Sequence, residues 1–464
     1  MQSMFRQTVS TLSQVEVSRE LGPLLSHSAV IVDGNTTAYP RWSSYEAPAP
    51  GVVVTPATEE DVAKTVEFAT SKNIPFLAQT GAHGWSEFHL KQNGIIINMR
   101  KLNSVSFNCD KTQVTIGGGV LISELTIAAF QNMALVHTGN CPCVGVLGAG
   151  LGGGYGNLQG LYGLAVDNML SLNVVLADGK IHTITPKDED LWWALRGAGP
   201  NFGIVTSAIL KSFPVSSDKQ IAWFGQLIYS GDKIEDVVKA IDNLTLAPEM
   251  SIFMYFITSG APNYSPMIAL TPFYYGREKE ARAAFKPLLD LGPTDDTTSE
   301  LQYAHWNDGA EGFCTKGGYK PAYTAGLTKM DSTTWKAAWD EYVKFVAIKG
   351  AGQSIVIMEA YSLEKSRSFL QSSSAFAWRN KVNFNAVAIP WYYDSGLESE
   401  AKAFGSKLRD LWRSTDGLDS PAAYINFAHG DEDLSAIYGE NLDRLRSIKV
   451  QVDPNNVFNQ WFTL

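Results

Sequence analysis

The sequence predicts an α+β protein with more than one domain, and three observations support this prediction. Between residues 52 and 210, short β-branched runs alternate with short helical patterns and glycine-rich loops. After Pro214, longer amphipathic helices alternate with aromatic strands, and no comparable glycine-rich loop recurs. From about Tyr424 the chain returns to short motifs. These changes indicate domain boundaries near residue 214 and again ahead of Tyr424.

The first part of the chain is predicted to alternate between strands and helices. Thr58 is followed by three acidic residues, a pattern typical of a helix N-cap with negative charge in the first turn. An Asp-Gly turn at Asp178 predicts a hairpin between residues 171–176 and 181–184. Further strands are predicted over residues 52–56, 74–79, 94–99, 114–120 and 203–210, and further helices over residues 123–132 and 188–199.

The later part is predicted to contain longer helices and aromatic strands. The last helix carries Leu442, Leu445 and Ile448 on one face. Helices are predicted over residues 233–244, 279–291 and 333–349, and strands over residues 251–258 and 355–361.

One loop, residues 139–157, is so rich in glycine that core packing cannot explain it; we call it the cradle. Glycine contributes no side chain and loses the most backbone entropy on ordering. It is useful where the backbone approaches a ligand closely and directs successive N–H groups at an anion. The cradle therefore predicts a site for a phosphate-bearing cofactor.

A nicotinamide-binding Rossmann fold is the first alternative, since residues 148–153 formally match G-x-G-x-x-G. That motif requires a helix directly after the glycines and an acidic residue about 20 positions on. Here residues 157–164 contain two more glycines, which disfavour a helix, and Asp167 comes too early. We therefore disfavour the Rossmann alternative.

Composition and charge exclude several classes of protein. The chain is 45% hydrophobic and 18% charged, as is typical of a folded globular protein. Its net charge of −10 argues against a nucleic-acid partner, and no stretch is apolar enough for a membrane span. Residues 1–21 lack the pattern of a signal peptide, so we expect a cytoplasmic protein or a secreted one whose leader was removed. We also expect a monomer.

The four cysteines are too few for a disulfide scaffold in a chain of this length. Cys141 and Cys143 form a C-x-C pair, which is not the C-x-x-C of a redox couple or of half a zinc site. Since no histidine or second cysteine pair has metal-ligand spacing near them, we expect no metal.

Five motifs together resemble the berberine bridge enzyme-like flavoproteins of the vanillyl-alcohol oxidase superfamily. They lie in the family's order along nearly the whole chain: residues 80–83, 139–146, 152–156, 190–197 and 453–458. The resemblance implies a two-part PCMH-type FAD-binding domain built from residues 1–213 and 418–464. It also implies an inserted α+β substrate domain over residues 214–417, with an antiparallel sheet flanked by helices.

The resemblance further implies that FAD is attached twice, through His83 to the 8α-methyl and through Cys141 to C6. The residues agree, because each follows a glycine-loop junction where a cofactor would approach. An isolated histidine would more simply be an ordinary loop residue. Cys143 has no counterpart in the family, and we expect it to be a small packed thiol.

By the same resemblance, a larger set of residues should surround FAD. The expected cofactor residues are Gln79, Thr80, Gly81, Ala82, His83, Gly84, Trp85, Gly139, Cys141, Val144, Gly145, Gly148, Ala149, Gly152, Gly156, Asn157, Ile204 and Asn426. Two of them depart from the family, which often has arginine at Gln79 and glycine at Ala82. Both contacts can be made by backbone N–H groups, so FAD binding is still expected.

The catalytic positions depart more. The family carries a base, Glu or Gln, where this chain has Asn385, and a tail tyrosine where this chain has Phe427. Tyr155 remains as a polar group over the flavin. Glu359 and Tyr361 are further candidates, although a structural role for Glu359 fits equally well.

These residues predict an FAD-linked oxidase of a small hydrophobic secondary metabolite, performing oxidative cyclisation, desaturation or alcohol oxidation. Val144 resembles the family's oxygen gatekeeper, which favours O2 as electron acceptor and hydrogen peroxide as by-product. A carbohydrate oxidase is one alternative, but Phe427 counts against it because it cannot activate an alcohol. The other alternative is a flavoprotein that steers a non-redox cyclisation or isomerisation with a structural FAD.

Overall fold

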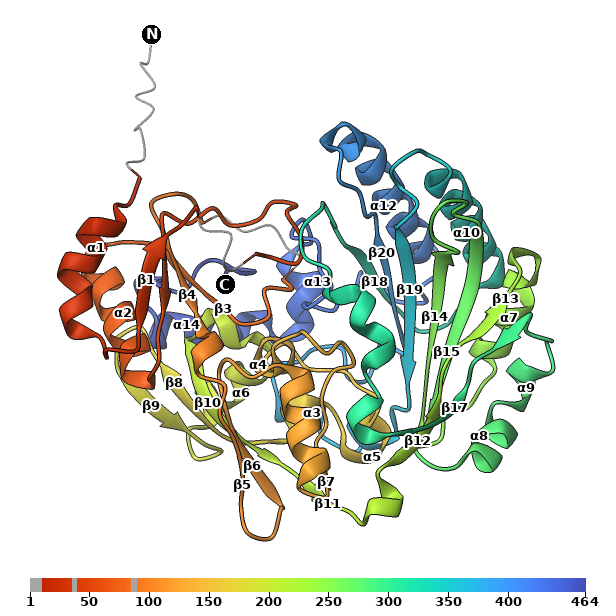
Figure 1. Ribbon diagram of the computed structural model, residues 1–464, viewed down its shortest axis with the longest axis horizontal. Helices are drawn as coiled ribbons and strands as arrows, with labels where there is room; N and C mark the ends of the chain where they lie inside the picture. The colour runs from red at the N-terminus through yellow and green to blue at the C-terminus, as the bar shows by residue number, and fades with distance from the viewer. Residues whose placement is uncertain (1–10, 36–39, 85–89) are drawn as a thin grey trace.

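A computed structural model describes residues 11–35, 40–84 and 90–464. The N-terminal half of the chain lies beside a large antiparallel sheet formed by the later residues (Figure 1). The C-terminal helices α13 (Leu434–Tyr438) and α14 (Leu442–Val452) return to the N-terminal half. No helix among the described residues has the length and apolar character needed to cross a membrane.

The first small sheet has the order β1-β2-β4-β3, with β1 antiparallel and the other three strands parallel. The predicted cap at Thr58 is confirmed, because its hydroxyl accepts from Asp61 N and the Asp61 carboxylate accepts from Thr58 N. These elements are α1 (Gln14–Leu21), β1 (Val30–Asp33), β2 (Val52–Thr55), α2 (Glu59–Ser71), β3 (Phe76–Gln79) and β4 (Ile95–Asn98).

The second sheet is antiparallel and has the order β5-β6-β10-β8-β9. The predicted hairpin is confirmed as β8 and β9, and Gly179 in its turn takes the left-handed φ of 72° that favours glycine. The elements of this region are β5 (Val105–Phe107), β6 (Gln113–Gly117), α3 (Ile122–Gln131), β7 (Ala134–Leu135), α4 (Val146–Gly150), α5 (Gln159–Tyr162), β8 (Met169–Val175), β9 (Ile181–Ile184), α6 (Glu189–Ala198), β10 (Ile204–Lys211) and β11 (Phe213–Pro214).

The large sheet runs β16-β13-β15-β14-β19-β20-β18, with β12 and β17 attached beside β15. Helices α7, α10 and α12 pack on one of its faces (Figure 1). Its strands are β12 (Ile221–Phe224), β13 (Leu227–Tyr229), β14 (Met250–Thr258), β15 (Pro266–Tyr274), β16 (Asp295–Asp296), β17 (Ser299–Gln302), β18 (Tyr323–Leu327), β19 (Ile355–Tyr361) and β20 (Phe384–Ile389). The helices of this part of the chain are α7 (Ile234–Asp242), α8 (Glu278–Ala284), α9 (Lys286–Leu289), α10 (Ser332–Val346), α11 (Glu364–Arg367) and α12 (Glu398–Arg413).

Side chains alternate across this sheet with the two-residue period of a strand. Met254 and Met358 are buried in the core between the sheet and its helices. Tyr255 and Glu359, one position along each strand, lie on the opposite face and line a cavity. One face of the sheet therefore belongs to the packed core, and the other lines the cavity.

The single helix predicted over residues 279–291 is wrong. The structure has two short helices, α8 and α9, separated at Phe285. Pro287 lies in the first turn of α9, where its missing N–H is tolerated, but it cannot continue a preceding helix. The apolar periodicity continues across the break, and this explains the prediction of one helix.

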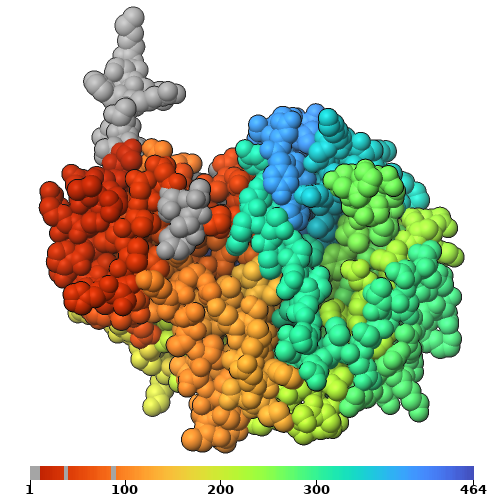
Figure 2. Space-filling model, in the orientation of Figure 1, coloured from red at the N-terminus to blue at the C-terminus, as the bar shows by residue number. Residues whose placement is uncertain are grey.

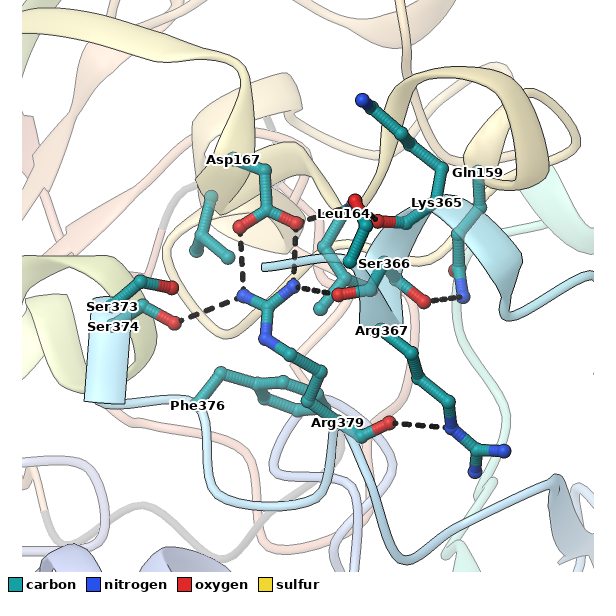
Figure 3. A network of polar contacts seen from close by, with 12 residues as sticks. Gln159, Leu164, Asp167, Lys365, Ser366, Arg367, Ser373, Ser374, Phe376 and Arg379 are labelled. Carbon is teal, nitrogen blue, oxygen red and sulfur yellow. Dashed lines mark hydrogen bonds and ion pairs between the residues drawn. The ribbon is translucent and has the colours of Figure 1, made fainter. Parts of the chain in front are cut away.

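A buried ion pair fastens the segment between α11 and β20 to the N-terminal half (Figure 3). Arg379 donates from Nη1 to Asp167 Oδ2 at 2.6 Å and from Nη2 to Asp167 Oδ1 at 2.7 Å. The same guanidinium donates to the Ser366 carbonyl at 2.8 Å and to Ser374 Oγ at 3.3 Å. Because both charged side chains are buried, each depends on the other to compensate for lost hydration.

Candidate active site

A cavity of about 380 Å³ lies between the cradle, the loop after β3 and the inner face of the large sheet. Most of the predicted cofactor residues line it: Gln79, Thr80, Gly81, Ala82, His83, Gly84, Gly139, Cys141, Val144, Gly145, Gly148, Ala149, Ile204 and Asn426. Trp85 lies outside the described residues. Segments far apart in the sequence thus form one site.

Three predicted cofactor residues, Gly152, Gly156 and Asn157, do not line this cavity. A Cβ at Gly152 would lie 2.3 Å from a side-chain oxygen of the C-terminal tail, and one at Gly156 would lie 1.9 Å from the Thr138 carbonyl oxygen. The Asn157 side chain accepts a hydrogen bond from Ser251 Oγ at 2.8 Å. Gly152 and Gly156 therefore have no side chain because other protein atoms occupy the space where a Cβ would lie. Asn157 is needed for its hydrogen bond.

Glycines at the cavity surface fit a ligand that approaches the backbone. A Cβ at Gly148 would meet no described atom within 4 Å outside its own helix, so the space beside it belongs to the cavity. Gly81 and Gly145 serve a different purpose, because a Cβ there would lie 2.5 Å from the Cys143 carbonyl and 2.8 Å from a Thr80 methyl. The two loops therefore pack against each other and leave an open backbone surface that suits FAD.

Ala82 adopts a left-handed backbone with φ of 59°, a conformation that non-glycine residues rarely take. The resemblance predicts glycine at this position, and the observed φ gives the physical reason. Its carbonyl accepts a hydrogen bond from Trp42 N at 2.9 Å, which helps to hold the strained residue. The residue directly before His83 is thus held by a backbone hydrogen bond.

The His83 imidazole is held in a form that can act as a nucleophile. Its ring stacks on Trp42 with centroids 5.4 Å apart, and Nε2 is buried without a hydrogen-bond partner among the described residues. Burial, together with the positive charges of Lys316, Lys320 and Arg41, lowers the pKa of His83 to about 3. His83 is therefore neutral at pH 7 and keeps a nitrogen lone pair available.

Cys141 lies beside His83 at the same end of the cavity. One donor atom each from His83, Cys141 and Cys143 all lie within 4.8 Å of one another. Burial raises the pKa of the Cys141 thiol to about 11. The donor atoms of His83 and Cys141 are thus close enough to bond to two neighbouring positions of one flavin ring system.

The expectation that Cys143 is a packed thiol is wrong. Cys143 forms a disulfide with Cys314, across 171 residues and with Cα atoms 5.8 Å apart. No local spacing could reveal this pairing, because Cys314 reaches the cradle only through the folded chain. The disulfide also occupies the Cys143 sulfur, so that of this group only His83 and Cys141 keep a free donor atom among the described residues.

The opposite wall of the cavity is largely aromatic and contains one carboxylate. Tyr361 Oη donates to Glu359 Oε2 at 3.0 Å, and Asn140 Nδ2 donates to Tyr361 Oη at 3.2 Å. Burial raises the pKa of Glu359 to about 7, although the hydrogen bond from Tyr361 opposes this shift. Glu359 can therefore exchange a proton near neutral pH.

Tyr155 lies in this wall as an aromatic hydrogen-bond donor. Its ring stacks on Tyr361 at 5.4 Å and meets Tyr424 edge-on at 4.8 Å. Burial raises the pKa of Tyr155 to about 12, and the Asn385 side chain opposes that shift. Asn385 does not line the cavity; it lies on β20 directly opposite Glu359 on β19. The three predicted catalytic residues are thus neighbours: Tyr155 and Glu359 line the cavity, and Asn385 lies next to them without lining it.

The C-terminal tail completes the site. Asn426 Nδ2 donates to the Ala149 carbonyl at 2.8 Å and to Tyr424 Oη at 2.6 Å. Phe427 lines the cavity and packs edge-on against Tyr424 at 5.0 Å. The tail therefore contributes an amide to the cradle and an apolar ring, without a titratable group at residue 427.

Sequence reasoning missed several lining residues. Arg41 donates from Nη1 to Gln79 Oε1 at 3.2 Å, so a guanidinium reaches the position where the resemblance leads us to expect arginine. Tyr255 lies in a predicted strand, whose side chains alternate between the two faces of the sheet. It could have been identified if the sequence had shown which face the helices cover. The other missed lining residues include Trp42, Phe253, Phe313, Asn459 and Trp461.

Comparisons with known proteins agree with this arrangement. Residues 50–185 match the family model described as FAD binding domain, and residues 423–460 match the model described as Berberine and berberine like. The FAD-linked oxidoreductase OXR1 of Pyricularia oryzae is 34% identical over 97% of this chain and 92% of its own length.

Two solved structures have the same fold. BBE-like 1 of Physcomitrella patens superposes with a TM-score of 0.83 and 21% identity, over 97% of this chain and 98% of its own. The xylooligosaccharide oxidase of Myceliophthora thermophila C1, solved with xylobiose, superposes with a TM-score of 0.80 and 20% identity, over 97% of this chain and 99% of its own. Together with the observed helices and sheets, these likenesses confirm the predicted α+β fold class.

Proposed function

We infer that this chain, which belongs to the berberine bridge enzyme-like FAD-linked oxidoreductases, is an oxidase of small hydrophobic, largely aromatic molecules. The observation that carries the inference is the buried Glu359 carboxylate in an aromatic wall, facing the cradle across the cavity. Such a wall offers a substrate large apolar contacts and one proton acceptor.

The chain's own residues would hold the cofactor at one end of this cavity. We propose that His83 and Cys141 both attach to FAD, and that backbone groups of the cradle near Gly148 contact it. FAD, when bound, supplies the two-electron acceptor for the reaction. The neutral imidazole of His83, whose Nε2 has no hydrogen-bond partner in the described part of the chain, supports the first attachment.

We propose Glu359 as the base. The family resemblance leads us to expect a base at the position of Asn385, and the directly opposite residue of the neighbouring strand is Glu359. Opposite residues in an antiparallel pair project from the same face of a sheet, so a carboxylate still reaches this region. Tyr361 orients the carboxylate, which takes a proton from a substrate hydroxyl or an acidic C–H group.

The same arrangement gives Tyr155 a different role. With a pKa of about 12, it stays protonated at pH 7, so it is suited to donate a hydrogen bond to a substrate oxygen. Glu359, with a pKa of about 7, is the better proton acceptor of the two. We therefore assign binding and orientation to Tyr155 and proton removal to Glu359.

We propose dioxygen as the final electron acceptor. The substrate gives up two electrons and two protons, and dioxygen takes them up as hydrogen peroxide. Val144 lines the cavity beside Cys141, and a valine there leaves more space than a leucine or isoleucine would. Packed interiors respond to volume changes of one methylene, so this position is suited to control access of a small gas molecule.

Anaerobic mixing tests the oxidase and its substrate class. We expect polycyclic phenols to bleach the flavin absorbance, xylobiose to leave it unchanged, and admitted air to yield one hydrogen peroxide per substrate oxidised. Bleaching by xylobiose would indicate a carbohydrate oxidase, and product without bleaching would indicate non-redox chemistry. Bleaching without peroxide formation would rule out the oxidase.

The two attachments can be tested without a substrate. After acid precipitation, we expect the flavin to stay with the protein, whose intact mass should exceed the chain mass by one FAD. His83→Ala and Cys141→Ala should each retain the flavin through the other bond. Complete release of flavin from the unmodified protein on denaturation would contradict both attachments.

A further inference from the structure

Three cysteines meet at the edge of the cavity. Cys143 is bonded to Cys314, and the Cys141 sulfur lies 3.7 Å from the Cys143 sulfur. Cys141 itself is a half-buried, unbonded thiol, whereas the fourth cysteine, Cys109, is exposed. A thiol in van der Waals contact with a disulfide sulfur has the composition of a thiol–disulfide exchange site.

We propose that Cys141, Cys143 and Cys314 form an internal thiol–disulfide exchange site. The Cys141 sulfur bonds to the Cys143 sulfur, the bond between Cys143 and Cys314 breaks, and the proton lost by Cys141 ends on Cys314. One disulfide and one thiol are present before and after, so the step needs no external oxidant or reductant. It requires only that the Cys141 thiolate forms.

The charged and titratable groups around Cys141 control the rate of this exchange, because they determine how much of the thiol is ionised. Burial raises the pKa of Cys141 to about 11, whereas the Cys143 backbone N–H and the positive charge of Lys316 favour the thiolate. His83 is neutral, and burial raises the pKa of Tyr255, so neither adds charge at pH 7. Exchange should therefore be slow at neutral pH and should accelerate with rising pH.

The exchange changes how one wall of the cavity is held. Cys314 ends the short helical segment Asp308–Cys314, whose Ala310 and Phe313 line the cavity. In Figure 2, the teal segment that follows β17 runs along the boundary between the N-terminal half and the large sheet. With the bridge to Cys143 intact, this segment is covalently tied to the cradle.

Once Cys314 is released, weaker contacts hold the segment. Lys316 Nζ donates to the Gly81 carbonyl at 2.6 Å, and Trp42 Nε1 donates to the Phe313 carbonyl. Exchange would thus replace the covalent attachment of the segment Asp308–Cys314 to the cradle by hydrogen bonds alone. Attachment of FAD to Cys141 would remove the attacking thiol, so that the disulfide between Cys143 and Cys314 could no longer exchange; this last step rests on the proposed function.

Disulfide mapping of the full-length chain tests the proposal. The chain is prepared with attached flavin and, from riboflavin-depleted cells, without it, and both are incubated at several pH values. Samples are denatured in acid, labelled with N-ethylmaleimide and digested without reduction. In the flavin-free chain we expect label on Cys314 together with a Cys141–Cys143 disulfide, appearing about tenfold faster for each unit of pH below 11.

Two controls make the result decisive. Cys109 should be fully labelled in every sample, and Cys141→Ser, which keeps the size of the side chain but removes the attacking sulfur, should leave Cys314 unlabelled. Label on Cys314 no greater in the flavin-free chain than in Cys141→Ser would overturn the exchange site. Exchange in a holoprotein whose mass shows flavin bonded only at His83 would refute the attachment at Cys141 and leave the exchange site standing.

Discussion

Glu359 on β19 lies directly opposite Asn385 on β20, and the Asn385 side chain opposes the rise in the pKa of Tyr155 that burial causes. The carboxylate and the phenol are thereby brought to one wall of the cavity from two distant parts of the chain. Their pKa values differ in a useful way, about 7 for Glu359 and about 12 for Tyr155. Groups with separated pKa values in one site are suited to different roles in proton transfer.

The first prediction concerns Glu359→Gln. If Glu359 must be ionised to remove a proton, the rate of flavin reduction by a phenolic substrate should rise with pH through about 7 and then level off. In Glu359→Gln we expect a rate lower by about 10²–10⁴-fold and no such rise. Anaerobic stopped-flow absorbance measures both. Tyr155→Phe is the matched control, because it should bind substrate more weakly but keep the rise; an unaltered pH profile in Glu359→Gln would exclude Glu359 as the base.

Protein stability gives an independent check on the same carboxyl group. Folding raises the pKa of Glu359, so between the ordinary carboxyl range and pH 7 the folded protein keeps a proton that the unfolded chain has lost. The free energy of unfolding contributed by this group must therefore fall as pH rises across that interval. In Glu359→Gln this contribution should disappear, and urea denaturation of the flavin-free chain at pH 5 and pH 8 would show it.

The second prediction separates glycines that face the cavity from glycines that pack against protein. In Gly148→Ala, we expect the flavin-free chain to keep its stability or gain up to about 1 kcal/mol, because the new methyl group would meet no described atom outside its own helix. Its flavin-to-protein absorbance ratio should nevertheless fall. In Gly81→Ala, both quantities should fall, because the new Cβ would lie 2.5 Å from the Cys143 carbonyl oxygen.

Gly22→Ala is the control for this pair, because Gly22 has open space around it and does not line the cavity. It should change neither the stability nor the flavin content by much. Full flavin content in Gly148→Ala would mean that no ligand approaches the cradle at that point.

Much of the fold could be predicted because its signals are local. The Thr58 cap and the turn at Asp178 each involve neighbouring residues, and both were found where the sequence placed them. The break at Pro287 was missed although its signal is local too, because apolar periodicity on both sides of the proline favoured one helix. Local evidence fails where two local signals compete.

The site could be predicted only in part, because half of it depends on register. Glycine density marked the cradle, and the motif around His83 marked the loop after β3. The opposite wall depends on which face of β14 and β19 turns inward, and on Glu359 being paired with Asn385. The pairing of Cys143 with Cys314 likewise depends on the folded chain, since 171 residues separate them.

The third prediction concerns the buried pair of Asp167 and Arg379. Asp167→Asn and Arg379→Met should each lower the free energy of unfolding by about 3–5 kcal/mol, because each leaves a buried group without its partner. The double variant should lose less than the sum of the two. Urea denaturation of the three variants measures this coupling.

An exposed pair provides the comparison. Lys286 in α9 forms an exposed ion pair with Asp290, which directly follows that helix, and Asp290→Asn should change the stability by no more than about 1 kcal/mol. Strict additivity of the two buried substitutions would show that Asp167 and Arg379 do not stabilise the fold as a unit.

The last prediction concerns Val144 and the reoxidation of the enzyme by dioxygen. Val144 lines the cavity three residues after Cys141 and packs partly against the core. One added methylene in Val144→Leu would fill space that a small molecule could otherwise use, since packed interiors cannot absorb such a volume without displacement. We therefore expect Val144→Leu to slow reoxidation severely while leaving flavin reduction near its original rate.

Reduction with dithionite followed by mixing with dissolved oxygen isolates this step, so the test needs no substrate. Val144→Ala is the matched variant: it enlarges the same space and should reoxidise at least as fast as the unmodified protein. A general disturbance of packing would slow reoxidation in both variants or in neither. If side-chain volume controls access of dioxygen, reoxidation must be fastest with alanine at residue 144, slower with valine and slowest with leucine. Equal reoxidation rates in all three proteins would show that dioxygen reaches the flavin by another route.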